Sequence, residues 1–262
     1  MKKRLWWLLG AILIAVLLYS GYRAIDILAG YAQGEAVRQD AVRRAVVIAD
    51  EGLPAAQTEV PESEEVPTQT PLEKPPITVD FDALHKINPE VAGWLYCADT
   101  PINDPVVHTD NNTYYLKHLY TGEANRNGTL FIDSRCSPDF SDPNTIIYGH
   151  HMKSGAMFAC LVEYGNQEYY DAHPVMYLLT PQRNYRLDLF SGYVSESGSQ
   201  RFFMGSGDET EFESYVAEIK ALSDFKPGKC PNDQNRIITM STCTYDFDEA
   251  RYILHAFVTE IG

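Results

Sequence analysis

The chain has 262 residues, of which 45% are hydrophobic and 12% aromatic, which is enough to bury a substantial core. Its 36 Asp and Glu residues against 21 Lys and Arg give a formal net charge of −15, which argues against a nucleic-acid partner because phosphates are bound through clustered cations. The acidity is most simply explained by solubility. Cysteines stand at positions 97, 136, 160, 230 and 243. An odd number without a C-x-x-C pair argues against a disulfide framework and a zinc site, and we expect no metal or other cofactor.

Residues 1–23 predict an N-terminal transmembrane anchor. Lys2, Lys3 and Arg4 precede an uncharged run from Leu5 to Tyr22. That run is close to the ~20 apolar residues that span a bilayer, and the positive-inside rule keeps its N-terminus cytoplasmic and the rest of the chain extracellular. The alternative is a cleaved secretory signal. It fits less well, because the run exceeds a typical apolar region of roughly 7–15 residues and no clear A-x-A site follows.

The next two segments differ sharply in composition. Residues 24–52 are rich in Ala, Ile, Val and Arg and contain no Pro, so we expect a helical stalk that continues out of the membrane. Residues 53–76 are rich in Pro, Glu and Thr, and such a segment cannot bury enough apolar surface to fold. We interpret it as a linker that either gives the following domain reach or is an inert spacer.

The folded domain is expected over residues 77–262. Asp80 or Asp82 would cap a short helix that runs to Ile87. Eight strand-like runs follow, at residues 93–97, 105–109, 129–134, 145–150, 175–180, 185–194, 236–243 and 252–259. Short strands separated by Gly, Pro, Asn and Asp predict a mainly β fold, either a sandwich or a barrel.

Two helices are expected to interrupt the strands. The first covers Met157–Tyr170 and the second Asp208–Leu222. In the second, Phe212, Tyr215, Val216 and Ile219 recur at helical spacing, so this face should pack on the core and not on a ligand.

One cysteine ends a predicted strand. Alternation places Cys243 on the same face as Thr239 and Ser241, and turns Met240 the opposite way. A buried, inert thiol is the alternative, since free Cys usually packs as a small hydrophobe. A nucleophilic thiolate would need a nearby base or cation.

Residues 144–152, N-T-I-I-Y-G-H-H-M, supply a candidate base. His150 and His151 are adjacent, so only one of them points into a site if the strand stays regular. Arg251 follows the cysteine by eight residues (251 − 243 = 8) and is the candidate cation. His255 shares strand parity with Arg251 and is the alternative cation, whereas the remaining histidines are most simply surface or core residues.

Two motifs resemble those of one family. Thr239–Cys243, T-M-S-T-C, resembles the T-L-x-T-C signature of sortases, with Met in place of Leu. Tyr148–Met152, Y-G-H-H-M, is similar to the histidine segment of class B sortases. Further blocks that resemble this family, in the family's order, are Gly93–Leu95, Asp104–Val107, Tyr114–Leu116, Gly128–Asp133 and Met157–Phe158.

The resemblance implies a fold and a reaction. It implies an eight-stranded barrel with N-terminal helices and a helix before the cysteine strand, and it assigns the family's catalytic set to Cys243, His150 and Arg251. Such an enzyme cleaves a C-terminal sorting signal of secreted proteins, of N-P-x-T-x type in class B, at a Thr carbonyl. It then transfers the thioacyl intermediate to an amine of a peptidoglycan precursor or a pilin. We choose His150 over His151 from the family position directly after Gly149.

Substrate contacts are expected from residues beside the cysteine. Ser241 shares the strand face of Cys243 and would either hydrogen-bond substrate or face solvent, whereas parity turns Thr242 inward unless the strand ends there. Two other functions remain open on the residues alone. A cysteine peptidase would use the same three residue types, and a membrane-anchored binding module would use none of them. A cell-wall transpeptidase of another fold typically keeps His and Cys close in sequence, whereas 93 positions separate them here (243 − 150 = 93).

Overall fold

The computed structural model describes residues 2–48, 73–196, 202–205, 208–228, 235–243 and 250–262. The strands are β1 Val46–Ile48, β2 Ile77–Val79, β3 Val91–Tyr96, β4 Asn103–Val107, β5 Leu130–Ile132, β6 Asn144–Gly149, β7 Val175–Leu179, β8 Asn184–Glu196, β9 Ile237–Cys243 and β10 Ala250–Ile261. The helices are α1 Lys2–Ala45, α2 Phe81–His85, the 3-10 helix η1 Phe158–Gly165, α3 Gln167–Ala172 and α4 Glu209–Ala221.

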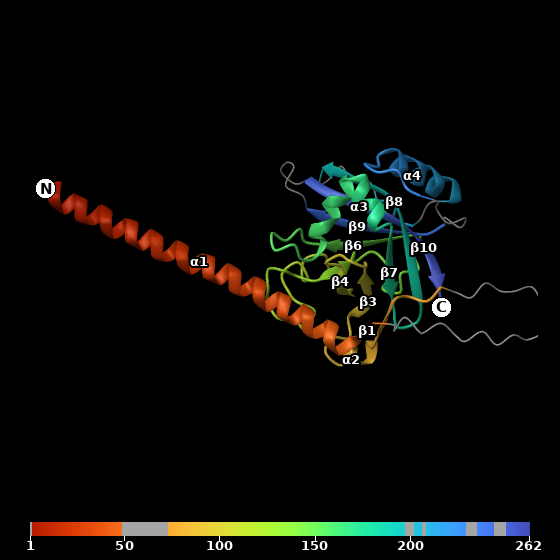
Figure 1. The fold of residues 1–262 in the computed structure, drawn as a ribbon, viewed down its shortest axis with the longest axis horizontal. Coiled ribbons are helices and arrows are strands. Elements are labelled where there is room, and N and C mark those ends of the chain that lie inside the picture. Colours follow the sequence, from red (N-terminus) through yellow and green to blue (C-terminus); the bar gives the residue numbers. More distant parts are fainter. Residues whose placement is uncertain (1, 49–72, 197–201, 206–207, 229–234, 244–249) are drawn as a thin grey trace, which may run out of the picture.

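Strands β3 to β10 form a closed barrel in the order β10-β8-β7-β3-β4-β5-β6-β9 (Figure 1). The pairs β4–β5 and β6–β9 are parallel and the remaining pairs are antiparallel. Each of the eight predicted strands is present, with ends shifted by at most a few residues. Closure into one barrel confirms the fold expected from the family resemblance and excludes the sandwich.

Side-chain alternation along β9 and β10 divides the core into two layers. Ile238, Met240 and Leu254 belong to the cluster that fills the barrel. Ile237 and Phe257 belong to a second cluster on the opposite face of the sheet, which the apolar residues of α4 cover. Each such fully buried side chain contributes roughly 1.5–3 kcal/mol, so both faces of the cysteine strand are fixed by packing.

The helices agree with prediction except in two places. One is the end of the predicted stalk, where α1 ends at Ala45 and Val46–Ile48 form strand β1. Asp80 caps α2 by accepting a hydrogen bond from the Ala83 amide at 2.9 Å. In α4, Phe212, Val216 and Ile219 are buried, as the spacing predicted. The single helix predicted over residues 157–170 is wrong. There the chain forms η1 and α3, because Asn166 between them is extended and its side chain caps α3 at the Glu168 amide.

The predicted stalk is part of one long helix that packs on the barrel. Figure 1 shows α1 leaving the barrel as a single straight helix whose N-terminal half projects away from it. Its last turns bury Ala41 and Ala45, and the Asn125 amide nitrogen donates to the Gly30 carbonyl at 3.0 Å. Gly34 permits this approach, since a Cβ there would lie 2.2 Å from the Asn127 amide nitrogen. The C-terminal part of α1 therefore packs directly against the barrel domain.

Strands β1 and β2 flank the predicted linker. They pair antiparallel with Ile48 opposite Ile77, so the described residues on either side of that segment are neighbours. Its role as a linker stays a prediction. Most of the predicted linker, residues 53–72, lies outside the described residues. The described part runs beside the barrel, where the Glu73 carboxylate accepts hydrogen bonds from Tyr177 and Arg186.

Candidate active site

The ends of β6 and β9 bring the histidine and the cysteine together. These strands run parallel, with Tyr148 opposite Ser241 and Gly149 opposite Thr242. His150 and Cys243 are each the next residue along the chain, at the same end of the barrel. Two residues 93 positions apart in sequence thus end adjacent strands.

Arg251 lies directly across the sheet from the cysteine. Strands β9 and β10 are antiparallel with Cys243 opposite Arg251, and directly opposed residues have Cα atoms about 4.5–5.5 Å apart. The gap of eight residues is therefore the span between two paired positions of neighbouring strands. Residues 244–249, which include Asp246, Asp248 and Glu249, lie outside the described part of the chain.

A backbone carbonyl fixes one nitrogen of His150. The Nε2 atom lies 2.7 Å from the Leu116 carbonyl oxygen, and since a carbonyl only accepts, this nitrogen carries a proton. Gly128, at φ +63°, lies against the ring, and a Cβ there would approach the His150 Cδ2 to 3.2 Å and the Tyr115 carbonyl to 2.5 Å. The ring is half-buried, and the Nδ1 atom is the nitrogen available for proton exchange with a substrate.

A buried carboxylate at the end of β5 holds Tyr148 of the neighbouring strand β6. Asp133 has 0% exposure and accepts two hydrogen bonds from the Arg135 guanidinium, one from the Arg135 amide and one from the Tyr148 hydroxyl at 2.9 Å. Burial raises its pKa, but these hydrogen bonds prevail and lower the pKa to about 2. Burial and the Asp133 charge raise the pKa of Tyr148, which the positive charges of Arg135 and Arg251 oppose.

The two predicted substrate-binding residues are enclosed. Ser241 and Thr242 both have 0% exposure, so Ser241 does not face solvent in this structure. The Ser241 hydroxyl has no hydrogen-bond partner among the described residues, and a buried unpaired hydroxyl costs roughly 1–3 kcal/mol. A substrate group that reached it would remove that cost.

His255 is a core residue and not a second cation. It has 0% exposure, and burial lowers its pKa to about 3, so it is neutral at physiological pH. Its Nδ1 lies 2.9 Å from the Thr239 hydroxyl, which donates its own proton to the Asn144 amide oxygen at 2.7 Å. Nδ1–H is therefore the donor to Thr239, and Nε2 can accept from the Tyr193 hydroxyl at 3.4 Å.

The remaining described cysteines are poor nucleophiles. Cys97, Cys136 and Cys160 are free thiols with 9% exposure or less. Burial raises the pKa of each thiol, to about 12 for Cys160. Among the described residues no cluster of three or more His, Cys, Asp or Glu side chains is arranged to hold a metal ion. Within the described part of the chain, the candidate catalytic residues therefore lie where β6 and β9 end and β10 begins.

Comparison with known proteins identifies the family. Residues 99–259 match the sortase domain, and sortase B of Listeria monocytogenes is 35% identical over 173 residues, which cover 65% of this chain and 70% of that protein. The chain belongs to the class B sortases. The Staphylococcus aureus sortase B is 29% identical to this sortase over 169 residues, covering 64% of this chain and 69% of that protein. A solved Bacillus anthracis structure similar to sortase B superposes with a TM-score of 0.71 at 28% identity, covering 88% of this sortase and 98% of that chain.

Family membership makes this sortase a cysteine transpeptidase and excludes the non-catalytic binding module.

The sequence did not single out the groups that contact and orient the candidate catalytic residues. Leu116 acts through a backbone carbonyl, which has no signal in sequence. Asp133 and Tyr148 stood inside family-like blocks, but their hydrogen bond depends on the β5–β6 pairing.

Proposed function

We propose that this sortase is anchored in the membrane by α1 and uses Cys243 as nucleophile, His150 as general acid and base, and Arg251 as the cation of the site. The register of three strands supports the assignment most strongly. It places these residues at the ends of β6 and β9 and directly opposite on β10. The buried Cys97, Cys136 and Cys160 do not compete for this role.

The reaction proceeds in two acyl transfers. The Cys243 thiolate attacks the carbonyl carbon of a Thr in the sorting signal, and the resulting oxyanion is stabilised by the Arg251 guanidinium. His150 gives a proton to the leaving amine as the C–N bond breaks, which leaves a thioester. An incoming amine then loses a proton to His150, attacks the thioester and releases the thiolate. Since Nε2 is held by Leu116, these proton transfers use Nδ1.

Structures of related proteins support the proposed classes of substrate and acceptor. Solved sortase B structures that resemble this chain include a Staphylococcus aureus sortase B–substrate complex and a sortase B complexed with triglycine. We propose an N-P-x-T-x type signal on secreted proteins as donor, and an amine of a peptidoglycan precursor or pilin as acceptor. We also propose Ser241 and Thr242 as substrate contacts. The unpaired Ser241 hydroxyl supports a hydrogen bond to the peptide, which requires the substrate to open a residue that is fully buried in this structure.

Membrane attachment rests on the N-terminal half of α1. Within the described part of the chain this helix holds one segment long and apolar enough to cross a membrane. Its apolar side chains are exposed, Trp7 by 81% and Leu18 by 71%. With three cations before the run, we propose a single pass with a cytoplasmic N-terminus and an extracellular barrel.

The nucleophile is tested with full-length protein and N-P-x-T-x peptides in the presence and absence of an acceptor amine. Cys243→Ala should abolish peptide cleavage and formation of the covalent adduct seen by intact-protein mass spectrometry. Cys160→Ala, which removes a buried thiol of raised pKa, is the matched control and should retain cleavage. Cleavage that yields only hydrolysed peptide at saturating amine would favour a peptidase. Normal turnover of Cys243→Ala would exclude this cysteine as nucleophile.

A further inference from the structure

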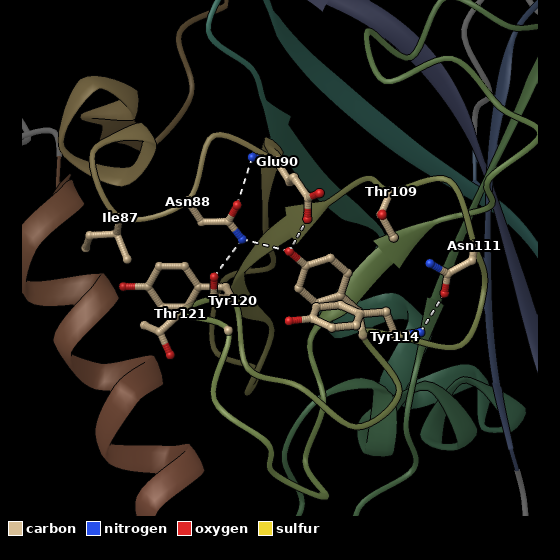
Figure 2. Close-up of a pocket in the computed structure, with 10 residues that line it drawn as sticks. Ile87, Asn88, Glu90, Thr109, Asn111, Tyr114, Tyr120 and Thr121 are labelled. Carbon is tan, nitrogen blue, oxygen red and sulfur yellow. Dashed lines mark hydrogen bonds between the residues drawn. The ribbon is translucent and has the colours of Figure 1, made fainter.

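A polar pocket of about 310 Å³ lies beside the crossover connection from β4 to β5. Figure 2 shows Asn88 and Glu90, from the α2–β3 connection, on one wall, and Tyr114 and Tyr120, from the crossover, on the other. Tyr115 also lines it and is only 2% exposed. The same crossover carries Leu116, the residue whose carbonyl binds His150.

The buried polar groups of this pocket are paired with one another. The Asn88 amide nitrogen donates to the Tyr115 hydroxyl at 2.8 Å and to the Tyr120 carbonyl at 2.6 Å, while its oxygen accepts from the Glu90 amide at 2.9 Å. The Tyr115 hydroxyl in turn donates to the Glu90 carboxylate. Figure 2 shows these hydrogen bonds as a connected set. Since Asn88 and the Tyr115 hydroxyl have no unused donor, the network fixes the chain and does not await a ligand.

Tyr115 is held at both ends. Its hydroxyl is bound to the α2–β3 connection, and its backbone carbonyl accepts from the Thr129 amide at 2.9 Å. Burial and the hydrogen bond to Glu90 raise the pKa of Tyr115, which keeps its hydroxyl a donor. Leu116 follows in the chain, with its carbonyl 2.7 Å from the His150 Nε2. The position of that carbonyl therefore depends on where Tyr115 is fixed.

We infer that Tyr115 is a positioning residue for the transpeptidation reaction: bound to Asn88 and Glu90, it places the Leu116 carbonyl that fixes the tautomer and orientation of His150. The inference rests on the proposed role of His150. With the carbonyl in place, Nε2 keeps its proton and Nδ1 is directed to the reacting groups. Without it, the imidazole rotates and exchanges tautomers, and small misplacements of a catalytic group are costly in rate.

The test compares Tyr115→Phe with Tyr120→Phe in the full-length protein. Both replace a buried tyrosine of the same pocket, but Tyr120 contacts Asn88 through its backbone carbonyl, which Phe retains. We expect Tyr115→Phe to lower the single-turnover acylation rate by about tenfold at saturating peptide, with an unchanged half-saturation concentration. Tyr120→Phe should acylate at the normal rate. Equal rates in the two variants would overturn the inference.

A double-mutant cycle separates positioning from a general structural effect. If Tyr115 acts through His150, Tyr115→Phe should have no further effect on the residual acylation rate of His150→Ala. The same loss in both backgrounds would overturn the inference and leave the proposed function intact. Normal acylation by His150→Ala would instead overturn the proposed function, and this inference with it.

Two further measurements cover the case in which Tyr115→Phe folds poorly. Glu90 is exposed, so Glu90→Ala weakens the same hydroxyl bond from the pocket side and should lower acylation, while Glu90→Gln keeps an acceptor and should restore it. In ¹⁵N spectra of labelled histidine, His150 should be Nε2-protonated in the parent protein and a mixture of tautomers in Glu90→Ala. A single unchanged tautomer there would contradict the role of the network.

Discussion

The proposed role of Arg251 rests on its position opposite Cys243. A guanidinium is always protonated and presents a planar fork of donors, whereas the Lys ammonium is a point charge on a flexible stem. Comparing Arg with Lys at position 251 therefore distinguishes two roles of the cation. A fork is needed to bind an oxyanion, and charge alone suffices to favour the Cys243 thiolate.

We predict that Arg251→Lys and Arg251→Ala both lose at least ~10²-fold in single-turnover acylation, because a lost oxyanion donor typically has an effect of that size. Folding of each variant is checked by thermal unfolding in the buffer used for the acylation assay. If the Lys variant retains most activity while the Ala variant does not, the cation acts mainly through its charge. Near-normal acylation in Arg251→Ala would remove Arg251 from the mechanism. His255 could not replace it, since its pKa of about 3 keeps it neutral.

At the scale of elements, the face of β9 and β10 opposite the barrel interior carries a buried polar cluster. Asn144, Thr239, His255 and Tyr193 come from four strands and form a hydrogen-bonded chain next to the helix α4. A buried histidine held neutral in this way links folding to pH. The unfolded chain binds a proton near pH 6.5 and the folded protein only near pH 3.

His255 makes the folded protein more stable at neutral pH than at acidic pH. Between pH 6.5 and 3 the unfolded state binds more protons at this position, so His255 stabilises the fold fully above pH 6.5 and progressively less as the pH falls. We predict that His255→Gln removes a slope of up to about 1.4 kcal/mol per pH unit from the free energy of unfolding. Urea unfolding of both proteins from pH 7 to 5 measures it. Parallel curves would show that His255 takes up its proton at the same pH in the folded and unfolded states, which would contradict the prediction.

On the scale of the whole molecule, the long apolar helix α1 is attached to the barrel domain at several points. The Asn125 side chain binds the Gly30 carbonyl, and Arg126 lies 3.5 Å from Asp26 on the same helix. The end of α1 is joined to the barrel domain a second time, where the Asp80 amide donates to the Ala45 carbonyl at 2.7 Å. These contacts fix the position of the barrel relative to the C-terminal part of α1.

We predict that protease added to intact cells cuts within residues 53–72, whose Pro- and Glu-rich composition favours cleavage, without releasing the barrel. The two fragments should remain together in the membrane fraction and separate in denaturant. The control is the charge-reversed Arg126→Glu, which weakens the α1 contact and should release more barrel after the cut. A barrel protected until the membrane is lysed would contradict the proposed extracellular location.

Local sequence was enough to predict most of the elements of this protein. The eight strands, the α4 face with Phe212 and Val216, and a cap at Asp80 or Asp82 follow from local rules of alternation, helical spacing and hydrogen bonding to nearby amides. The motifs around Cys243 and His150 also lie within a few residues of chain. These features depend on neighbours in sequence, so they could be predicted without the fold.

The tertiary structure decided what depends on distant contacts. The β6–β9 and β9–β10 registers bring His150 and Arg251 to the end of the cysteine strand, and only burial shows that His255 is neutral. Composition predicted a helical stalk and a linker, and only the folded structure shows that the C-terminal part of α1 packs on the barrel and that β1 pairs with β2. Pairing between strands and the loss of water around a side chain are set by residues far apart in the chain. For this reason the position and charge state of the groups in the site could be read only from the folded molecule.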